Sequence, residues 1–145
     1  MPAPLRISFI GGAVGAWRIE RINAECGESL APAERLEVRE GPLVSVPADA
    51  AWVLQGVTSN LRYTTDAERA TLAARQPALG HPEATRAALI PIRKTEAWWN
   101  LAQDTRRAIF EERSRHTSVG LEYLPAVARR LSHSRDLGEP FDFLT

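Results

Sequence analysis

Residues 87–94, AALIPIRK, begin the C-terminal part of the chain, whose pattern of strands and helices indicates the fold class. Their apolar character predicts a buried strand, and a mostly helical run follows from Thr95 to about Ala128. We expect this run to break or bend at Pro125, because proline lacks the N–H that a helix needs. The C-terminal half of the chain therefore begins with a strand that leads into helical structure.

Two more strands are predicted after the helical run. In residues 130–135, RLSHSR, Leu131, His133 and Arg135 alternate with their neighbours, as side chains do along a strand that begins near Arg129. A turn at 138–140, GEP, then leads into a last strand at 141–144, FDFL. This gives strand, helix, strand and strand, which are four of the six elements of the ferredoxin-like order. The sequence therefore predicts an α+β fold in which the last helix and strand of that order are missing.

The N-terminal half is compatible with a degenerate version of the same unit. Its first predicted elements are strands at 5–10 and 17–22, a short helix at 32–39 and a strand at 43–46. A further strand opens at Trp52 and runs on toward Tyr63, and Thr65 caps a helix in which Glu68 completes a capping box. Two such units side by side would form one α+β barrel, so we expect residues 1–145 to be a single domain.

Composition narrows the class of protein. The chain has 145 residues, of which 44% are hydrophobic and 25% charged, enough for one packed core. Its 18 basic and 18 acidic residues balance, so no overall field attracts nucleic acid or an anionic membrane. Cys26 is the sole cysteine, which excludes an internal disulfide and a cysteine-based metal site within one chain.

The N-terminus admits two interpretations. Arg6 precedes an apolar stretch from Ile7 to Trp17, a pattern shared with short signal peptides. The glycine pair at 11–12 and the charged residues at 18–21 instead favour a strand, a turn and a second strand. No apolar segment has the length of a membrane span, so we expect a cytoplasmic protein.

Several separated sequence blocks occur in the order typical of one haem-protein family. The blocks are ALIPIRK at 88–94, WW at 98–99, SRHT at 114–117, YLPAVARRL at 123–131 and RDLGEPFDFLT at 135–145. On these residues the sequence resembles the chlorite dismutases, and most of all their short-chain lineage, over about two thirds of its length. The resemblance implies a dimeric α+β barrel, a haem b cofactor (iron protoporphyrin IX) and a homodimer.

Two residues would carry the chemistry if the resemblance holds. His116 matches the family's axial ligand to the haem iron. Arg129 matches its distal arginine, whose permanent charge holds a small oxyanion such as chlorite. From the residues alone, a lone histidine is more often structural, and an arginine at a strand end is more often a solvated charge. The surrounding motif is what favours the functional interpretation.

Four further residues match positions near the haem edge. Lys94 and Trp98 are spaced to share a helix face, while Trp99 points elsewhere. The resemblance places Lys94 and the two tryptophans near a propionate and the axial histidine, although the tryptophans could equally anchor core packing. Tyr63, with Asn60 and Arg62, falls where the family also approaches the propionates.

The implied reaction is the decomposition of chlorite to chloride and dioxygen. An oxygen atom passes from chlorite to the iron and leaves hypochlorite, and the ferryl oxygen and hypochlorite then recombine. Two alternatives stay open: a non-catalytic haem-binding or truncated remnant, and a related coproheme decarboxylase or peroxidase activity. The decarboxylase branch lacks an arginine at the position of Arg129, which disfavours it.

The sequence departs from the family pattern after Thr145, where relatives continue into a helix and a last strand. The continuation includes the glutamate that accepts the axial histidine's N–H, and what would replace it stays open. We therefore expect either a chain that folds poorly or a barrel that a partner chain completes.

Overall fold

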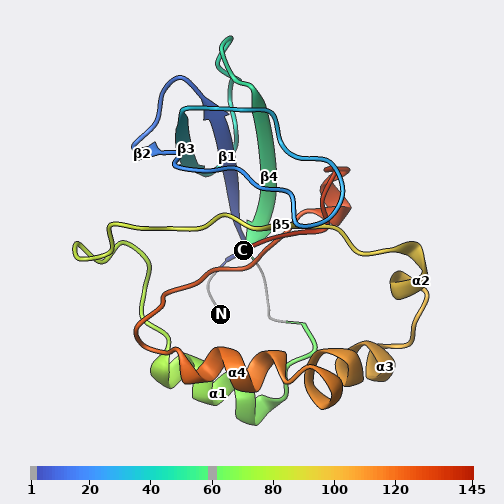
Figure 1. Ribbon diagram of the computed structural model, residues 1–145. Coiled ribbons are helices and arrows are strands. Elements are labelled where there is room, and N and C mark those ends of the chain that lie inside the picture. The colour runs from blue at the N-terminus through green and yellow to red at the C-terminus, as the bar shows by residue number, and fades with distance from the viewer. Residues whose placement is uncertain (1–2, 59–61) are drawn as a thin grey trace. The chain divides into compact units, whose positions relative to one another are not determined.

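The computed structural model describes residues 3–58 and 62–145 (Figure 1). The chain divides into two compact units. The first comprises Met1–Ser59 and Ser132–Pro140, and the second comprises Asn60–Leu131 and Phe141–Thr145. Among the described residues, the first unit is built on antiparallel strands and the second contains all the α-helices.

The first unit is an antiparallel sheet. Its strands are β1 (Leu5–Gly12), β2 (Trp17–Arg18), β3 (Arg35–Glu40), β4 (Trp52–Thr58) and β6 (Ser132–His133), followed by the 3₁₀ turn η2 (Arg135–Leu137). They lie in the order β2-β3-β1-β4-β6, so β1 is central and pairs with both β3 and β4. The register places Ile7 opposite Glu40 on β3 and Gly56 on β4.

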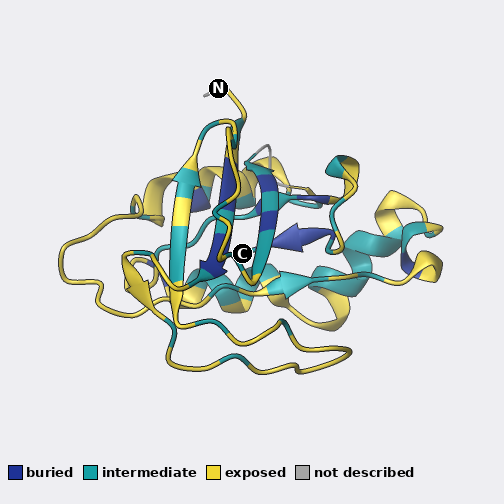
Figure 2. Ribbon diagram, turned by 90° about the horizontal axis from the view of Figure 1, so that it is seen from above, coloured by how far each residue is buried: buried dark blue, intermediate teal, exposed yellow. Residues whose placement is uncertain are grey.

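The core of the first unit lies on β1 and β4, where Figure 2 shows the buried residues. The apolar side chains of Ile7, Ile10 and Leu54 are almost completely buried, because removing apolar surface from water is favourable. Gly56 allows β6 to approach β4 closely, because a Cβ at this position would lie 2.6 Å from the Cβ of Ser132.

The second unit combines helices with a short strand pair. Its elements are α1 (Asp66–Arg75), β5 (Pro91–Ile92), α2 (Glu96–Trp99), α3 (Gln103–Arg107), the π-helix η1 (Ala108–Arg113), α4 (His116–Glu122) and β7 (Phe143–Leu144). The predicted helical run is thus confirmed as several short helices. It ends before Pro125, as expected from the missing N–H.

The capping box predicted for α1 is present. The backbone N–H of Glu68 donates to Oγ1 of Thr65 at 3.2 Å, and the N–H of Thr65 donates to the Glu68 carboxylate at 2.9 Å. Gln76, which ends α1, donates its side-chain amide to the carbonyl of Arg129 at 2.7 Å. This bond ties the end of α1 to the segment that follows α4.

The strand pair of the second unit joins distant parts of the sequence. Pro91 lies opposite Leu144, and Ile92 lies opposite Phe143. Backbone bonds between Ile90 and Thr145 extend the ladder at one end, at 2.8 and 3.2 Å. The segment that leads into α2 is therefore held beside the last residues of the chain.

The prediction of a helix at 32–39 is wrong. The chain forms β3 there, and its register with β1 runs from Ile7↔Glu40 to Gly12↔Arg35. The backbone hydrogen bonds of this pairing outweigh the weak local preference for a helix.

Several predicted strands are shorter or absent. The strands predicted at 17–22 and 141–144 are confined to Trp17–Arg18 and Phe143–Leu144. Residues 43–46 form no strand, and Val44 is 96% exposed. The strand predicted at 87–94 is confined to Pro91–Ile92, where the partner β7 is available. The strand predicted from Arg129 onward contains Ser132–His133 alone, because η2 begins at Arg135.

Candidate functional site

The second unit contains an aromatic cluster built around Trp98. The Trp98 ring, which is buried, makes edge-to-face contacts with Tyr63, Trp99 and Phe110, with centroid separations of 5.7, 4.9 and 6.0 Å. Tyr63 also stacks on Phe110 at 5.6 Å. The buried indole N–H of Trp98 has no hydrogen-bond partner among the described residues. The cluster thus combines apolar rings with a buried donor that lacks a partner among the described residues, which is uncommon in folded proteins.

Two cations lie over these rings. The Lys94 ammonium is 5.2 Å from the ring centroids of both Trp98 and Phe110. Arg106 lies 5.0 Å over Trp98 and donates to the Tyr63 hydroxyl at 3.0 Å. Lys94 precedes α2, so Lys94 and Trp98 do not share a helix face as predicted. The two side chains nevertheless contact each other.

Trp99 is held on a different side from Trp98. The two indole planes are nearly perpendicular, at 89°, and Trp99 stacks on Phe143 at 5.8 Å. Its N–H donates to Oδ2 of Asp142 at 3.2 Å, and the same oxygen accepts the backbone N–H of Lys94 at 2.6 Å. A buried carboxylate therefore fixes both Lys94 and Trp99.

His116 is the first residue of α4. Its ring contacts Phe110 with a centroid separation of 5.4 Å. His116 is exposed, and the partial burial of its imidazole lowers the pKa of the ring; the charges of Arg129 and Lys94 lower it further, and Glu111 opposes them. The structure thus brings three predicted site residues, Lys94, His116 and Arg129, into one electrostatic neighbourhood.

Arg129 lies in the segment between α4 and β6, not on a strand as predicted. Its guanidinium packs against Gly120 of α4, where an added Cβ would lie 2.6 Å from Nη1. Gly120 is one helical turn after His116, so both residues lie on the same side of α4. The absence of a side chain at Gly120 creates the space that Arg129 fills.

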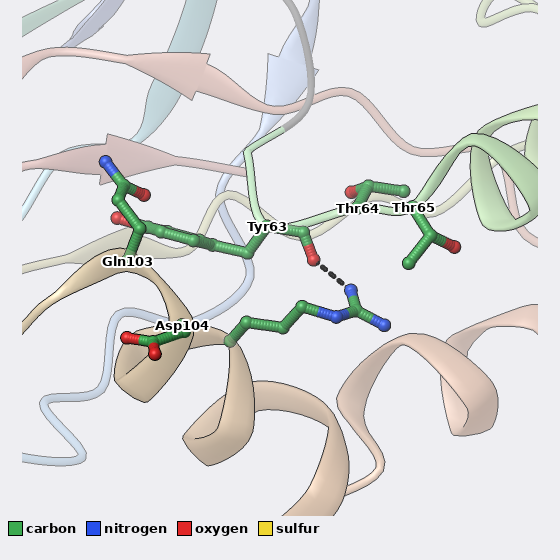
Figure 3. A pocket seen from close by; sticks show the side chains of 6 residues that line it. Tyr63, Thr64, Thr65, Gln103 and Asp104 are labelled. Carbon is green, nitrogen blue, oxygen red and sulfur yellow. Dashed lines mark hydrogen bonds between the residues drawn. The ribbon is translucent and has the colours of Figure 1, made fainter.

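A shallow pocket of about 260 Å³ lies beside the aromatic cluster (Figure 3). Its walls are Tyr63, Thr64, Thr65, Gln103, Asp104 and Arg107. Arg107 donates to both carboxylate oxygens of Glu68, at 2.7 and 2.9 Å. It also donates to the backbone carbonyl of Tyr63, and Figure 3 marks this last bond with a dashed line. This bidentate pair lowers the pKa of Glu68 to about 2. The bond from Arg107 to the Tyr63 carbonyl holds Tyr63 against α3.

Sequence reasoning missed Arg106, Glu111 and Asp142. No sequence motif marks Arg106 or Glu111, and the contacts of Asp142 join residues far apart in the chain. Asn60, which was grouped with Tyr63, lies outside the described residues. Within the described ranges, the helices are all too short or too polar to cross a membrane.

Comparison with known proteins identifies the family. No protein-family model matches the sequence. Among solved structures, the chain is similar to one from the crystal structure of dimeric chlorite dismutases from Nitrobacter winogradskyi, with 51% sequence identity and a TM-score of 0.86. The match covers 95% of this chain and 77% of that one, and it confirms the predicted α+β, ferredoxin-like fold. The chain therefore belongs to the chlorite dismutase family.

Proposed function

We propose that the chain binds haem b with His116 as axial ligand and decomposes chlorite to chloride and dioxygen, with Arg129 holding the anion. The observation that carries this proposal is that Lys94 lies over the aromatic cluster whose Phe110 the His116 ring contacts, while the charge of Arg129 acts on the same imidazole. The three residues come from separate segments of the second unit. Family membership supports the same assignment, because the similar solved protein is described as a chlorite dismutase.

The residues present fit a haem. The rings of Tyr63, Trp98 and Phe110 provide an apolar surface, and the buried N–H of Trp98 lacks a partner among the described residues. Lys94 and Arg106 supply positive charge beside these rings for the carboxylates of the propionates. His116 contributes an imidazole, the usual protein ligand to haem iron. When bound, haem supplies the redox chemistry of the reaction.

Arg129 binds and orients the substrate anion in this proposal. Its guanidinium stays charged at any working pH and offers several donors in a planar fork. The guanidinium lies against Gly120, on the helix that begins with His116, so both groups belong to one part of the second unit. Lys94 adds a second positive charge to the same neighbourhood. Anion binding here needs no side chain to give or take a proton.

A hemin titration tests the cofactor assignment. We expect a sharp, saturable Soret band at one haem per chain, which His116→Ala abolishes while the circular dichroism of the chain is unchanged. A folded chain without a saturable Soret band, or a His116→Ala variant with an unchanged one, would contradict the assignment.

An oxygen electrode tests the reaction. The haem-loaded chain should release dioxygen from chlorite, and Arg129→Ala should abolish this release but keep the Soret band. Arg86→Ala is the matched control, because Arg86 is an exposed arginine of the same unit. Full activity in Arg129→Ala would remove Arg129 from the mechanism. Haem binding without oxygen release from the unmodified chain would favour the second candidate, a non-catalytic haem-binding protein.

We also propose a homodimer, because the similar solved structure is described as dimeric. Light scattering with size-exclusion chromatography checks this assembly, and a monomer at all concentrations would overturn it.

A further inference from the structure

The carboxylate of Glu111 is bonded to the start of the helix that carries His116. One of its oxygens accepts the backbone N–H groups of Thr117 and Ser118, at 2.9 and 3.4 Å. The other accepts the hydroxyl of Ser118. These bonds lower the pKa of Glu111, so the side chain is an ionised acceptor at neutral pH. Glu111 therefore contacts the two residues that directly follow His116.

These bonds replace the ordinary N-cap of α4. The first N–H groups of a helix have no partner within the helix, and the residue before it usually accepts one of them. Here that residue is Arg115, which has a left-handed backbone with φ of 51° and makes no side-chain capping bond. The hydroxyl of the preceding Ser114 is directed to the carbonyls of Ile109 and Phe110 instead. The cap must come from elsewhere, and Glu111 provides it.

The local backbone explains how Glu111 reaches this position. Glu111 lies on the π-helix η1, whose turns are wider than those of an α-helix. The left-handed Arg115 then changes the direction of the chain between η1 and α4. The neighbouring Phe110 packs against the His116 ring with a centroid separation of 5.4 Å. Two consecutive residues of η1 thus hold the imidazole and the helix that presents it.

Glu111 also affects the charge around His116. Arg129 and Lys94 both act to lower the pKa of the imidazole, whereas the Glu111 carboxylate acts in the opposite direction. Glu111 is therefore the negative charge that partly offsets Arg129 and Lys94 at the His116 ring.

We propose that Glu111 is a positioning residue for His116: it fixes the first turn of α4 so that the imidazole keeps one direction toward the haem iron that it would bind. This inference rests on the proposed function, because it assigns the ligand role to His116. It makes a separate claim, however, about the haem-free chain: the amides of Thr117 and Ser118 are protected by Glu111.

The test compares Glu111→Ala with Glu111→Gln and Glu112→Ala. Glutamine keeps an acceptor oxygen of nearly the same reach and should rescue most of the effect. Glu112 is the matched control, because it is the adjacent glutamate on η1 and is exposed. The first measurement is amide hydrogen exchange by NMR on the haem-free chain. The second is hemin affinity, with the Soret and electron paramagnetic resonance spectra of the loaded chain.

We expect Glu111→Ala to speed exchange at Thr117 and Ser118 about tenfold, the loss of one typical hydrogen bond. We also expect Glu111→Ala to weaken hemin binding about tenfold. The electron paramagnetic resonance signals of the loaded chain should broaden, because the imidazole then takes several orientations. Glu112→Ala should change neither measurement. Unchanged exchange in Glu111→Ala would overturn the capping role. Faster exchange with unchanged hemin affinity and spectra would overturn the positioning role.

Failure of the proposed function gives a different result. If the unmodified chain binds no hemin, the function proposal fails while exchange at Thr117 and Ser118 still decides whether Glu111 caps α4. In that case the NMR signals of the His116 ring replace the hemin spectra. Ring signals that Glu111→Ala leaves unchanged would overturn the positioning of His116.

Discussion

Asp142 and Lys94 are 48 residues apart in the sequence, and Oδ2 of Asp142 accepts the backbone N–H of Lys94 at 2.6 Å. The same oxygen accepts the indole N–H of Trp99, and the N–H of Asp142 donates to the carbonyl of Ile92 at 2.8 Å. Asp142 is 8% exposed. One buried side chain therefore anchors both sides of the turn that leads into α2.

We predict that Asp142→Ala lowers the free energy of unfolding by about 2 to 4 kcal/mol, since each buried donor left without an acceptor costs about 1–3 kcal/mol. Asp142→Asn should lose less, because its amide oxygen still accepts a hydrogen bond. Urea unfolding followed by circular dichroism measures both values. The exposed Asp49→Ala is the control. Equal stability of Asp142→Ala and the control would show that these two bonds contribute nothing.

A second prediction concerns the ion pair between Glu68 and Arg107. The pKa of Glu68 falls from 4.5 to about 2 in the folded chain, mainly through its hydrogen bonds to Arg107. A carboxyl group with a lowered pKa stabilises the fold when it is ionised in both states. Its contribution is therefore complete above pH 4.5 and disappears as the pH falls toward 2.

Comparison of the unmodified chain with Glu68→Gln isolates this contribution. The difference in free energy of unfolding should be about 1–2 kcal/mol at neutral pH, after allowance for solvent screening. It should shrink steadily below pH 4.5. Glu122→Gln, at an exposed position on α4, should show no such pH dependence. A difference that persists unchanged at pH 2 would mean that the charge of Glu68 is not its source.

Local signals in the sequence predicted local structure well. The capping box of Thr65 and Glu68 needs contacts within one helical turn, and both its bonds are present. The β3 strand was predicted as a helix, because its structure depends on pairing with β1, a separate part of the chain. The same limit applies to the site. Sequence motifs singled out Lys94 and Trp99 as candidates, whereas the contacts of Asp142 with both can be recognised only in the fold.

The contact between Arg129 and Gly120 gives a final prediction. An added Cβ at Gly120 would lie 2.6 Å from Nη1 of Arg129, so Gly120→Ala must displace the guanidinium. Alanine is otherwise better than glycine within a helix by about 1 kcal/mol. We therefore expect Gly120→Ala to stabilise the chain by about 1 kcal/mol when Arg129→Ala is also present, and by less when Arg129 is retained.

A double-mutant cycle in urea measures this coupling. The guanidinium is the end of a flexible side chain, so the backbone need not move and the coupling should be a few tenths of a kcal/mol up to about 1 kcal/mol. Gly80→Ala does not suit as a control, because Gly80 has a φ of 88° that strains any other residue. Glu122→Ala on the same helix is the better comparison, because Glu122 is exposed. If Gly120→Ala gives the same gain with and without Arg129, the guanidinium does not rest on Gly120, and the space beside Gly120 is filled in another way.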